Sequence, residues 1–265
     1  MTYQTLIFDQ PRPGLGIITL NRPACLNAIN FQMLDDLYSL YAALEKDDQV
    51  RVLILTGKGR GFCSGADLKD EQLLSKASLK LFASAALHLE QIQQRYSGVV
   101  VGMRRLPQPV IAAVNGVAAG GGMCLALAAD IIIAGATAKF IPSFINIGLS
   151  GGELGTTYFL PKMVGSAKAS EILMTGRTVE AAEADQIGLA SCLAAEGELM
   201  DKAMATADQL LSKTPFGLRM TKAAIRQNLD ATSLETAIAF ENRNQSIGCT
   251  TAEFFEAVAA FAHKD

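Results

Sequence analysis

The stretch that decides the fold is PVIAAVNGVAAGGGMCLALAADIII, residues 109–133. It predicts a buried strand at 109–114, an apolar helix at 121–129 and an all-apolar strand at 131–133. A run of mostly β-branched and aliphatic residues at 50–56 predicts another strand. Strands that are apolar almost throughout and alternate with helices are typical of a parallel sheet covered on both faces. The sequence therefore predicts an α/β core.

On either side of this core the pattern changes. A strand at 16–20 and a helix at 30–45, with Asn30 as its N-cap, precede the core. Residues 67–97 are polar and prone to form helix, but their amphipathic pattern is weak. Beyond residue 165 we expect helices near 166–174, 179–186, 197–212, 216–228, 233–246 and 251–263. The C-terminal third is therefore expected to be helical and to pack on the core or on a neighbouring chain.

Composition narrows the class of protein. The chain has 265 residues, of which 50% are hydrophobic and 18% charged, and its formal net charge is −3. A chain of this length buries a large core, and its apolar fraction excludes intrinsic disorder. The near-neutral balance argues against a nucleic-acid partner, because such partners call for a basic face.

Few side chains are available for metal or redox chemistry. The two histidines, His88 and His263, have no neighbour at ligand spacing, and the five cysteines include no CxxC pair. The first residues show neither the basic nor the apolar region of a signal peptide, and no apolar stretch reaches the roughly 18 residues of a membrane span. We therefore expect a cytoplasmic protein with no metal, no cofactor and no membrane partner.

Two glycine-rich segments are the candidates for chemistry. FCSGADL at 62–68 and NGVAAGGG at 115–122 each follow a buried strand and are expected to open a helix. Glycine lets backbone N–H groups approach a ligand closely, and a helix N-terminus aims such donors outward. Two segments facing one point would form an oxyanion hole, in which each donor contributes about 3–4 kcal/mol to a transition state. The alternative is that these glycines only allow tight turns and close packing.

Four motifs, in order, resemble those of the enoyl-CoA hydratase/isomerase (crotonase) superfamily. They are LNRPACLNA at 20–28, FCSGADL at 62–68, VNG with GGG and an Asp within 114–130, and EAVAAF at 256–261. The likeness extends over nearly the whole chain.

This resemblance implies a fold, an assembly and a substrate. The fold is α/β, a ClpP/crotonase-like spiral of ββα units over residues 1–195, followed by a C-terminal helical trimerisation region over 196–265. The assembly is a homotrimer or a dimer of trimers. The substrate is an acyl-CoA thioester of fatty acid metabolism, so that coenzyme A is part of the substrate and no separate cofactor is expected.

The resemblance also assigns binding residues. The backbone N–H groups of Ala66 and Gly121 match the family's oxyanion hole, where they would stabilise an enolate on the thioester oxygen. The residues that match the family's contacts to coenzyme A are Ala24, Leu26, Ser64, Ala66, Asp67, Leu68, Phe261 and Lys264. We expect Asp67 also to order its loop, and Phe261 and Lys264 to come from a neighbouring subunit. Many relatives have Lys where this chain has Ala24. The phosphates of coenzyme A would then be bound by Lys58, Arg60, Lys69 or Lys264.

The pattern departs from the family at the two glutamates with which its hydratases hold water. Cys124 and Phe144 occupy the matching positions. Because a buried Cys behaves as a small hydrophobe and Phe carries no proton, water activation by two carboxylates is not expected. Glu153, within the glycine-rich segment 148–157, matches the single catalytic glutamate of the 3-enoyl-CoA to 2-enoyl-CoA isomerases. The residues alone also allow a helix N-terminal acid, stabilised by about 0.3–1 kcal/mol through the helix dipole.

The resemblance thus favours an enoyl-CoA isomerase. Ala66 and Gly121 would stabilise the enolate while Glu153 moves the proton from C2 to C4, and apolar neighbours would raise the pKa of Glu153. Two alternatives stay open. One is another reaction of the family, such as hydration by Glu153 alone. The other is a protein that binds acyl-CoA without catalysis and tolerates any residue at position 153.

Overall fold

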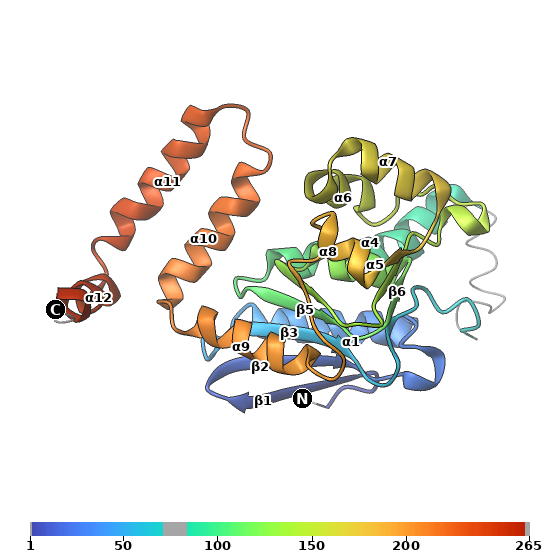
Figure 1. The fold of residues 1–265 in the computed structure, drawn as a ribbon, viewed down its shortest axis with the longest axis horizontal. Helices are drawn as coiled ribbons and strands as arrows, with labels where there is room; N and C mark the ends of the chain where they lie inside the picture. Colours follow the sequence, from blue (N-terminus) through green and yellow to red (C-terminus); the bar gives the residue numbers. More distant parts are fainter. Residues whose placement is uncertain (1, 71–83, 263–265) are drawn as a thin grey trace.

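The computed structural model describes residues 2–70 and 84–262, which form two sheets with helices packed around them (Figure 1). The six-stranded sheet, in the order β1-β2-β3-β5-β7-β10, consists of β1 (Leu6–Arg12), β2 (Gly14–Leu20), β3 (Val50–Gly57), β5 (Val110–Val114), β7 (Ile131–Ala134) and β10 (Cys192–Leu193). The four-stranded sheet, in the order β4-β6-β8-β9, consists of β4 (Gly61–Cys63), β6 (Val117–Ala119), β8 (Lys139–Ile141) and β9 (Val179–Glu180). Neighbouring strands run parallel except for the pairs β1–β2 and β8–β9.

The helices fall into a core group and a C-terminal group. The core group is α1 (Phe31–Leu44), α3 (Ala85–His88), α4 (Gln94–Arg105), α5 (Gly121–Ala128), α6 (Thr156–Val164), α7 (Ser166–Thr175), α8 (Ala181–Gln186) and α9 (Leu199–Leu211). The C-terminal group is α10 (Pro215–Asn228), α11 (Leu234–Gly248) and α12 (Ala252–Ala262). Short turns are η1 (Pro23–Cys25), the π-helical turn η2 (Leu89–Gln93) and η3 (Ile145–Ile147). The side chain of Asn30 accepts a hydrogen bond from the N–H of Met33, which confirms its predicted role as the N-cap of α1.

Strand β3 is buried on both of its faces. Leu53 and Leu55 belong to a large core shared with α1, α4 and α5, whereas Val52 and Ile54 pack in a second core that includes Ala203 of α9. Side chains of a strand alternate between faces, so a strand between two cores must be apolar throughout. This confirms the predicted parallel sheet with both faces covered.

The chain alternates between the two sheets as it advances. Strand β5 of the large sheet leads to β6 of the small sheet and then to α5, and β7 leads to β8 and then, through η3, to α6. This repeated order is the expected spiral of ββα units. Its consequence for function is that loops between the small sheet and the following helix gather on one side of the molecule.

Several elements differ from the sequence prediction. The short strands β4, β6 and β10 were not expected, and β9 occupies Val179–Glu180, at the start of the helix expected near 179–186. Strand β1 was not expected, because among its residues only Leu6 is buried and no apolar alternation marks it. It forms by antiparallel pairing with β2. Of the helical segment expected within 67–97, residues 71–83 lie outside the described residues. Its described part begins at Ala85 and continues to Arg105, because Val99, Val100 and Met103 of α4 are buried against the core although Gly98 and Gly102 interrupt their pattern.

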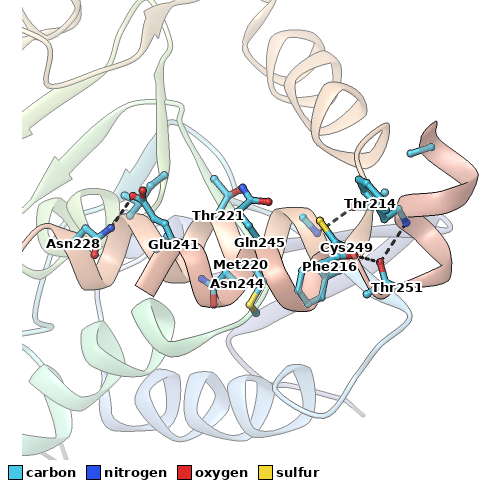
Figure 2. A pocket seen from close by; sticks show the side chains of 16 residues that line it. Thr214, Phe216, Met220, Thr221, Asn228, Glu241, Asn244, Gln245, Cys249 and Thr251 are labelled. Carbon is cyan, nitrogen blue, oxygen red and sulfur yellow. Dashed lines mark hydrogen bonds between the residues drawn. The ribbon is translucent and has the colours of Figure 1, made fainter. Parts of the chain in front are cut away.

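The C-terminal helices differ from α9 in how they contact the core. Helix α9 packs on the large sheet, and α10 contacts the core through Lys222, which forms an ion pair of 2.7 Å with Asp130, whereas α11 and α12 extend away from the core (Figure 1). A groove of about 580 Å³ lies between α10 and α11. At one end of it the side chain of Asn228 donates to Glu241 Oε1 at 3.0 Å (Figure 2). The division of the chain at residue 195 stays a prediction. No helix in the described part of the chain is long and apolar enough to span a bilayer.

Candidate active site

A pocket of about 240 Å³ brings the three predicted catalytic residues together. Ala66, Gly121 and Glu153 all line it, although they lie in separate parts of the chain. Ser64 and Leu68, two of the predicted contacts to coenzyme A, line the same pocket. The structure therefore places two candidate oxyanion donors and one carboxylate around a single cavity.

The orientation of Ala66 is fixed by a short bridge to Ile29. The N–H of Ile29 donates to Gly65 O at 2.7 Å, and the N–H of Asp67 donates to Ile29 O at 2.9 Å. In such a parallel bridge the N–H of Ala66 points away from Ile29, and no acceptor for it exists among the described residues. Between Ala66 and Asp70 the chain forms this bridge and then a turn rather than a helix, and residues 71–83, where the predicted helix would continue, lie outside the described residues.

The segment before Ala66 is held by two residues of the LNRPACLNA motif. Asn27 is fully buried, and its amide donates to Lys58 O at 3.0 Å and to Gly61 O at 2.8 Å. Arg22 forms an ion pair of 2.8 Å with Asp67. The Asp67 carboxylate thus orders its loop, as expected, and its predicted contact to coenzyme A stays a prediction.

The second donor, Gly121, is the first residue of α5. Its N–H lies in the first helical turn and so has no acceptor within the helix. A Cβ on Gly65, whose φ is +92°, would lie 2.8 Å from Ala119 O and 3.2 Å from the Gly121 nitrogen. A Cβ on Gly122 would lie 2.0 Å from Cys63 O. The glycines at these positions therefore serve both purposes. They let the two segments pack closely, and this close packing brings the two backbone donors near one another.

The backbone of Glu153 is locked by the start of α6. Its N–H donates to Thr156 Oγ1 at 3.1 Å, and its carbonyl accepts from the N–H of Thr156 at 2.9 Å. The same carbonyl accepts from Cys124 Sγ at 3.6 Å. Burial raises the pKa of the Cys124 thiol, so this residue stays protonated and acts as a donor rather than as a base.

The carboxylate of Glu153 faces groups from a different helix. Gln93 Nε2, at the end of the π-helical turn η2, donates to Glu153 Oε1. Burial raises the pKa of Glu153, while the N–H of Leu154, the amide of Gln93 and the charge of His88 act in the opposite direction. A carboxyl group with a raised pKa is suited to take and return a proton near neutral pH.

Gln93 and His88 were not found by the sequence reasoning. Both line the pocket, but the segment 67–97 gave only a weak amphipathic pattern. A π-helical turn changes the spacing of residues on one face, so a search for a period of 3.6 residues does not detect it.

Apart from Ser143 and glycine residues, the remaining wall of the pocket is apolar or aromatic. Phe144 lies on this wall, at the position where the family's hydratases have a glutamate. Its other such residues are Leu68, Ile92, Tyr96, Ile147, Leu149 and Leu154. Among the described residues that line the pocket, Glu153 is the single carboxylate. The described part of the chain has no cluster of three or more His, Cys, Asp or Glu side chains that could hold a metal ion.

The predicted contacts to coenzyme A fall into two groups. The loop with the exposed Ala24 and the half-buried Leu26 lies beside Ser64, whose N–H donates to Leu26 O at 2.9 Å. Phe261 belongs to α12, which lies at the opposite end of the molecule from α5 (Figure 1), and Lys264 lies outside the described residues. A single chain therefore does not bring α12 to Ala66, and the predicted contribution from a neighbouring subunit stays a prediction.

Comparison with known proteins gives the family. Residues 11–265 match the family described as Enoyl-CoA hydratase/isomerase. The chain is 42% identical over 264 residues to a Mycobacterium bovis protein named "Probable enoyl-CoA hydratase echA12", which covers 99% of this chain and 92% of that protein. It is 35% identical over 258 residues to the 1,2-epoxyphenylacetyl-CoA isomerase of Escherichia coli, with coverage of 97% and 95%.

A solved structure agrees with the sequence relatives. The crystal structure of a monofunctional enoyl CoA isomerase from M. smegmatis superposes with a TM-score of 0.74 at 38% identity, over 88% of this chain and 98% of that chain. Most of the other relatives carry hydratase names, so the names alone do not separate the two activities. The ClpP/crotonase-like fold expected from the motifs is confirmed, and the chain belongs to the enoyl-CoA hydratase/isomerase family.

Proposed function

We propose that this enzyme shifts the double bond of a 3-enoyl-CoA to give the 2-enoyl-CoA. The observation that carries the proposal is that Glu153 is the single carboxylate among the described residues lining a pocket that also holds two free backbone donors. A shift of a double bond needs one group that removes a proton and returns it. Hydration in the manner of the family's hydratases needs a second carboxylate to hold the water.

The two backbone donors would act on the thioester. When the proton leaves C2, negative charge develops on the thioester oxygen. The N–H groups of Ala66 and Gly121 would donate to this oxygen, and each such donor contributes about 3–4 kcal/mol to a transition state. Both are backbone groups fixed by secondary structure, so little reorganisation accompanies the reaction.

Glu153 would move the proton. Its ionised carboxylate takes the proton from C2, which leaves a dienolate whose charge is shared between the thioester oxygen and C4. The carboxylic acid then returns the proton to C4, and the double bond lies between C2 and C3 in the product. The carboxylate is regenerated, so the reaction consumes no other reagent.

The experiment compares two substrates in the wild-type protein and in Glu153→Gln. The wild type is expected to convert 3-enoyl-CoA to 2-enoyl-CoA and to hydrate 2-enoyl-CoA poorly. The variant is expected to lose isomerase activity by a factor of about 10² to 10⁴, the usual contribution of a general acid–base group. Equal isomerase activity in both proteins would contradict the role of Glu153.

The other outcomes of this experiment identify the alternatives. Efficient hydration by the wild type would favour the hydratase names of the relatives over isomerisation. Tight binding of coenzyme A thioesters without turnover of any of them would favour a binding protein.

We also propose that α10, α11 and α12 close an interface between copies of this chain. Large apolar side chains are exposed on these helices, including Ile225 (59%), Leu234 (70%) and Phe255 (60%). Several large exposed apolar side chains on neighbouring helices are a feature of surfaces that contact another protein. Such an assembly would also allow the predicted contribution of Phe261 and Lys264 to a neighbouring site.

A further inference from the structure

We propose that Gln93 is a positioning residue that fixes the carboxylate of Glu153 in the orientation needed for proton transfer. The proposal rests on the proposed role of Glu153 as the proton carrier. It assigns a function to a residue and to a helical irregularity that the oxyanion hole and the carboxylate do not explain.

The geometry places Gln93 apart from the elements that build the rest of the site. Glu153 lies just before α6, whereas Gln93 ends the π-helical turn η2 between α3 and α4. The N–H of Gln94 donates to Leu89 O, five residues earlier, which is the hydrogen bond of a π-helix. Such turns occur frequently at functional sites, and here the turn ends on the residue that contacts the carboxylate.

The hydrogen bond from Gln93 gives the two carboxylate oxygens of Glu153 different roles. Oε1 of Glu153 accepts from Gln93 Nε2, so the other oxygen is left to exchange the proton with substrate. The backbone of Glu153 is already held by Thr156, and the N–H of Leu154 also acts on the carboxylate, so the contact with Gln93 adds a side-chain hydrogen bond that orients Oε1. Misplacement of a reacting group by about 1 Å can lower a rate by roughly 10²-fold.

The chemistry of an amide suits this task. An ionised carboxylate only accepts hydrogen bonds, whereas a protonated one also donates. Gln93 can donate through Nε2 to the ionised form and, after rotation of its amide, accept through Oε1 from the protonated form. Because the amide is uncharged, it can form a hydrogen bond with the Glu153 carboxyl group in both protonation states.

Two other titratable groups face Glu153. His88 of α3 acts on it through its charge, and the Cys124 thiol of α5 donates to its carbonyl. Both remain in place when only Gln93 is changed. A change in the titration of Glu153 on substitution of Gln93 would therefore report the lost hydrogen bond.

The test compares the wild type with Gln93→Met, which keeps the length of the side chain and removes both polar atoms. We expect a loss in kcat of about 10- to 100-fold with a smaller change in KM. The acid limb of the pH profile is expected to move to higher pH, because the lost bond stabilised the charged carboxylate. A ¹³C titration of the Glu153 carboxyl, assigned with Glu153→Gln, is expected to move in the same direction.

Controls keep the test decisive. Gln94→Met alters the neighbouring exposed residue of the same helix and is expected to leave kcat and both titrations unchanged. If Gln93→Met does not fold, Gln93→Glu retains the size of the side chain and should move the acid limb further, since it adds a like charge.

The outcomes separate this inference from the proposed function. An unchanged kcat, or a change in KM alone with an unmoved acid limb, would mean that Gln93 only shapes the pocket. If Glu153→Gln retains full activity, the proposed function fails, whereas the ¹³C titration still decides whether Gln93 controls the carboxyl group. If the wild type hydrates rather than isomerises, the same two titrations remain the test of Gln93.

Discussion

At the scale of single residues, the candidate site contains one carboxyl group whose pKa is raised by burial. Burial raises the pKa of Glu153, and Gln93, His88 and the N–H of Leu154 oppose this only in part. A shift of this kind has a consequence for stability as well as for catalysis, because the free energy of unfolding depends on the difference in pKa between the folded and unfolded states.

The stability prediction concerns Glu153→Gln. A carboxyl group whose pKa is raised in the folded state binds its proton more tightly there than in the unfolded chain. Its contribution to stability is therefore full below the unfolded pKa and is lost as pH rises through the folded pKa. Glutamine has no charge to bury, so the variant is expected to melt higher than the wild type at pH 7, and the difference should shrink near pH 4. Thermal unfolding at the two pH values measures this, and a variant that is less stable at pH 7 would contradict it.

At the scale of elements, the proposed oxyanion hole depends on two segments that approach each other at glycine positions. The donor segment around Ala66 is supported from behind by Asn27, which is buried with φ of +56° and binds carbonyl groups of the β3–β4 region. Asn27 is therefore a structural residue of this motif, since it supports the segment that carries the donor and does not line the pocket.

We expect Asn27→Ala to destabilise the protein by about 2–3 kcal/mol, because it leaves buried carbonyl groups without donors. It should also lower activity at temperatures where the protein is still folded, since the loop that carries Ala66 loses its support. Urea unfolding together with steady-state kinetics measures both effects. Asn242→Ala, at an exposed position of α11, is the matched control and should change neither. An Asn27→Ala protein of wild-type stability would contradict this account.

The sequence predicts much of the fold and of the site. The features that it did not predict have a common cause. The apolar runs at 109–114 and 131–133 were sufficient to place the sheet, because burial on both faces leaves a local signal. The backbone around Ala66 and the contact of Gln93 with Glu153 depend on partners that are distant in sequence. A local pattern does not record such pairings, so the bridge at Ala66 was not expected and Gln93 was missed.

At the scale of the whole molecule, the C-terminal helices leave apolar surface uncovered while α9 packs on the sheet. Leu234 is 70% exposed and Phe255 is 60% exposed, on α11 and α12 respectively. A second copy of the chain covering these helices would account for their composition.

The assembly prediction follows from this surface. Analytical ultracentrifugation of the wild type is expected to show a trimer or a dimer of trimers. Phe255→Glu places a charge in the interface and should produce smaller species, since an unpaired buried charge is costly. Met174→Glu, at an exposed position of α7 on the core, is the control and should keep the trimer. A monomeric wild type would contradict the proposed interface.

The central claim is that one carboxylate carries a proton from C2 to C4 of the substrate. Its most direct test is the fate of deuterium in a 3-enoyl-CoA labelled at C2, followed by mass spectrometry and NMR of the 2-enoyl-CoA product. We predict that part of the product carries the deuterium at C4 and that Glu153→Gln forms almost no product. Complete replacement of the label by solvent hydrogen, with Glu153→Gln turning over at the wild-type rate, would contradict the claim.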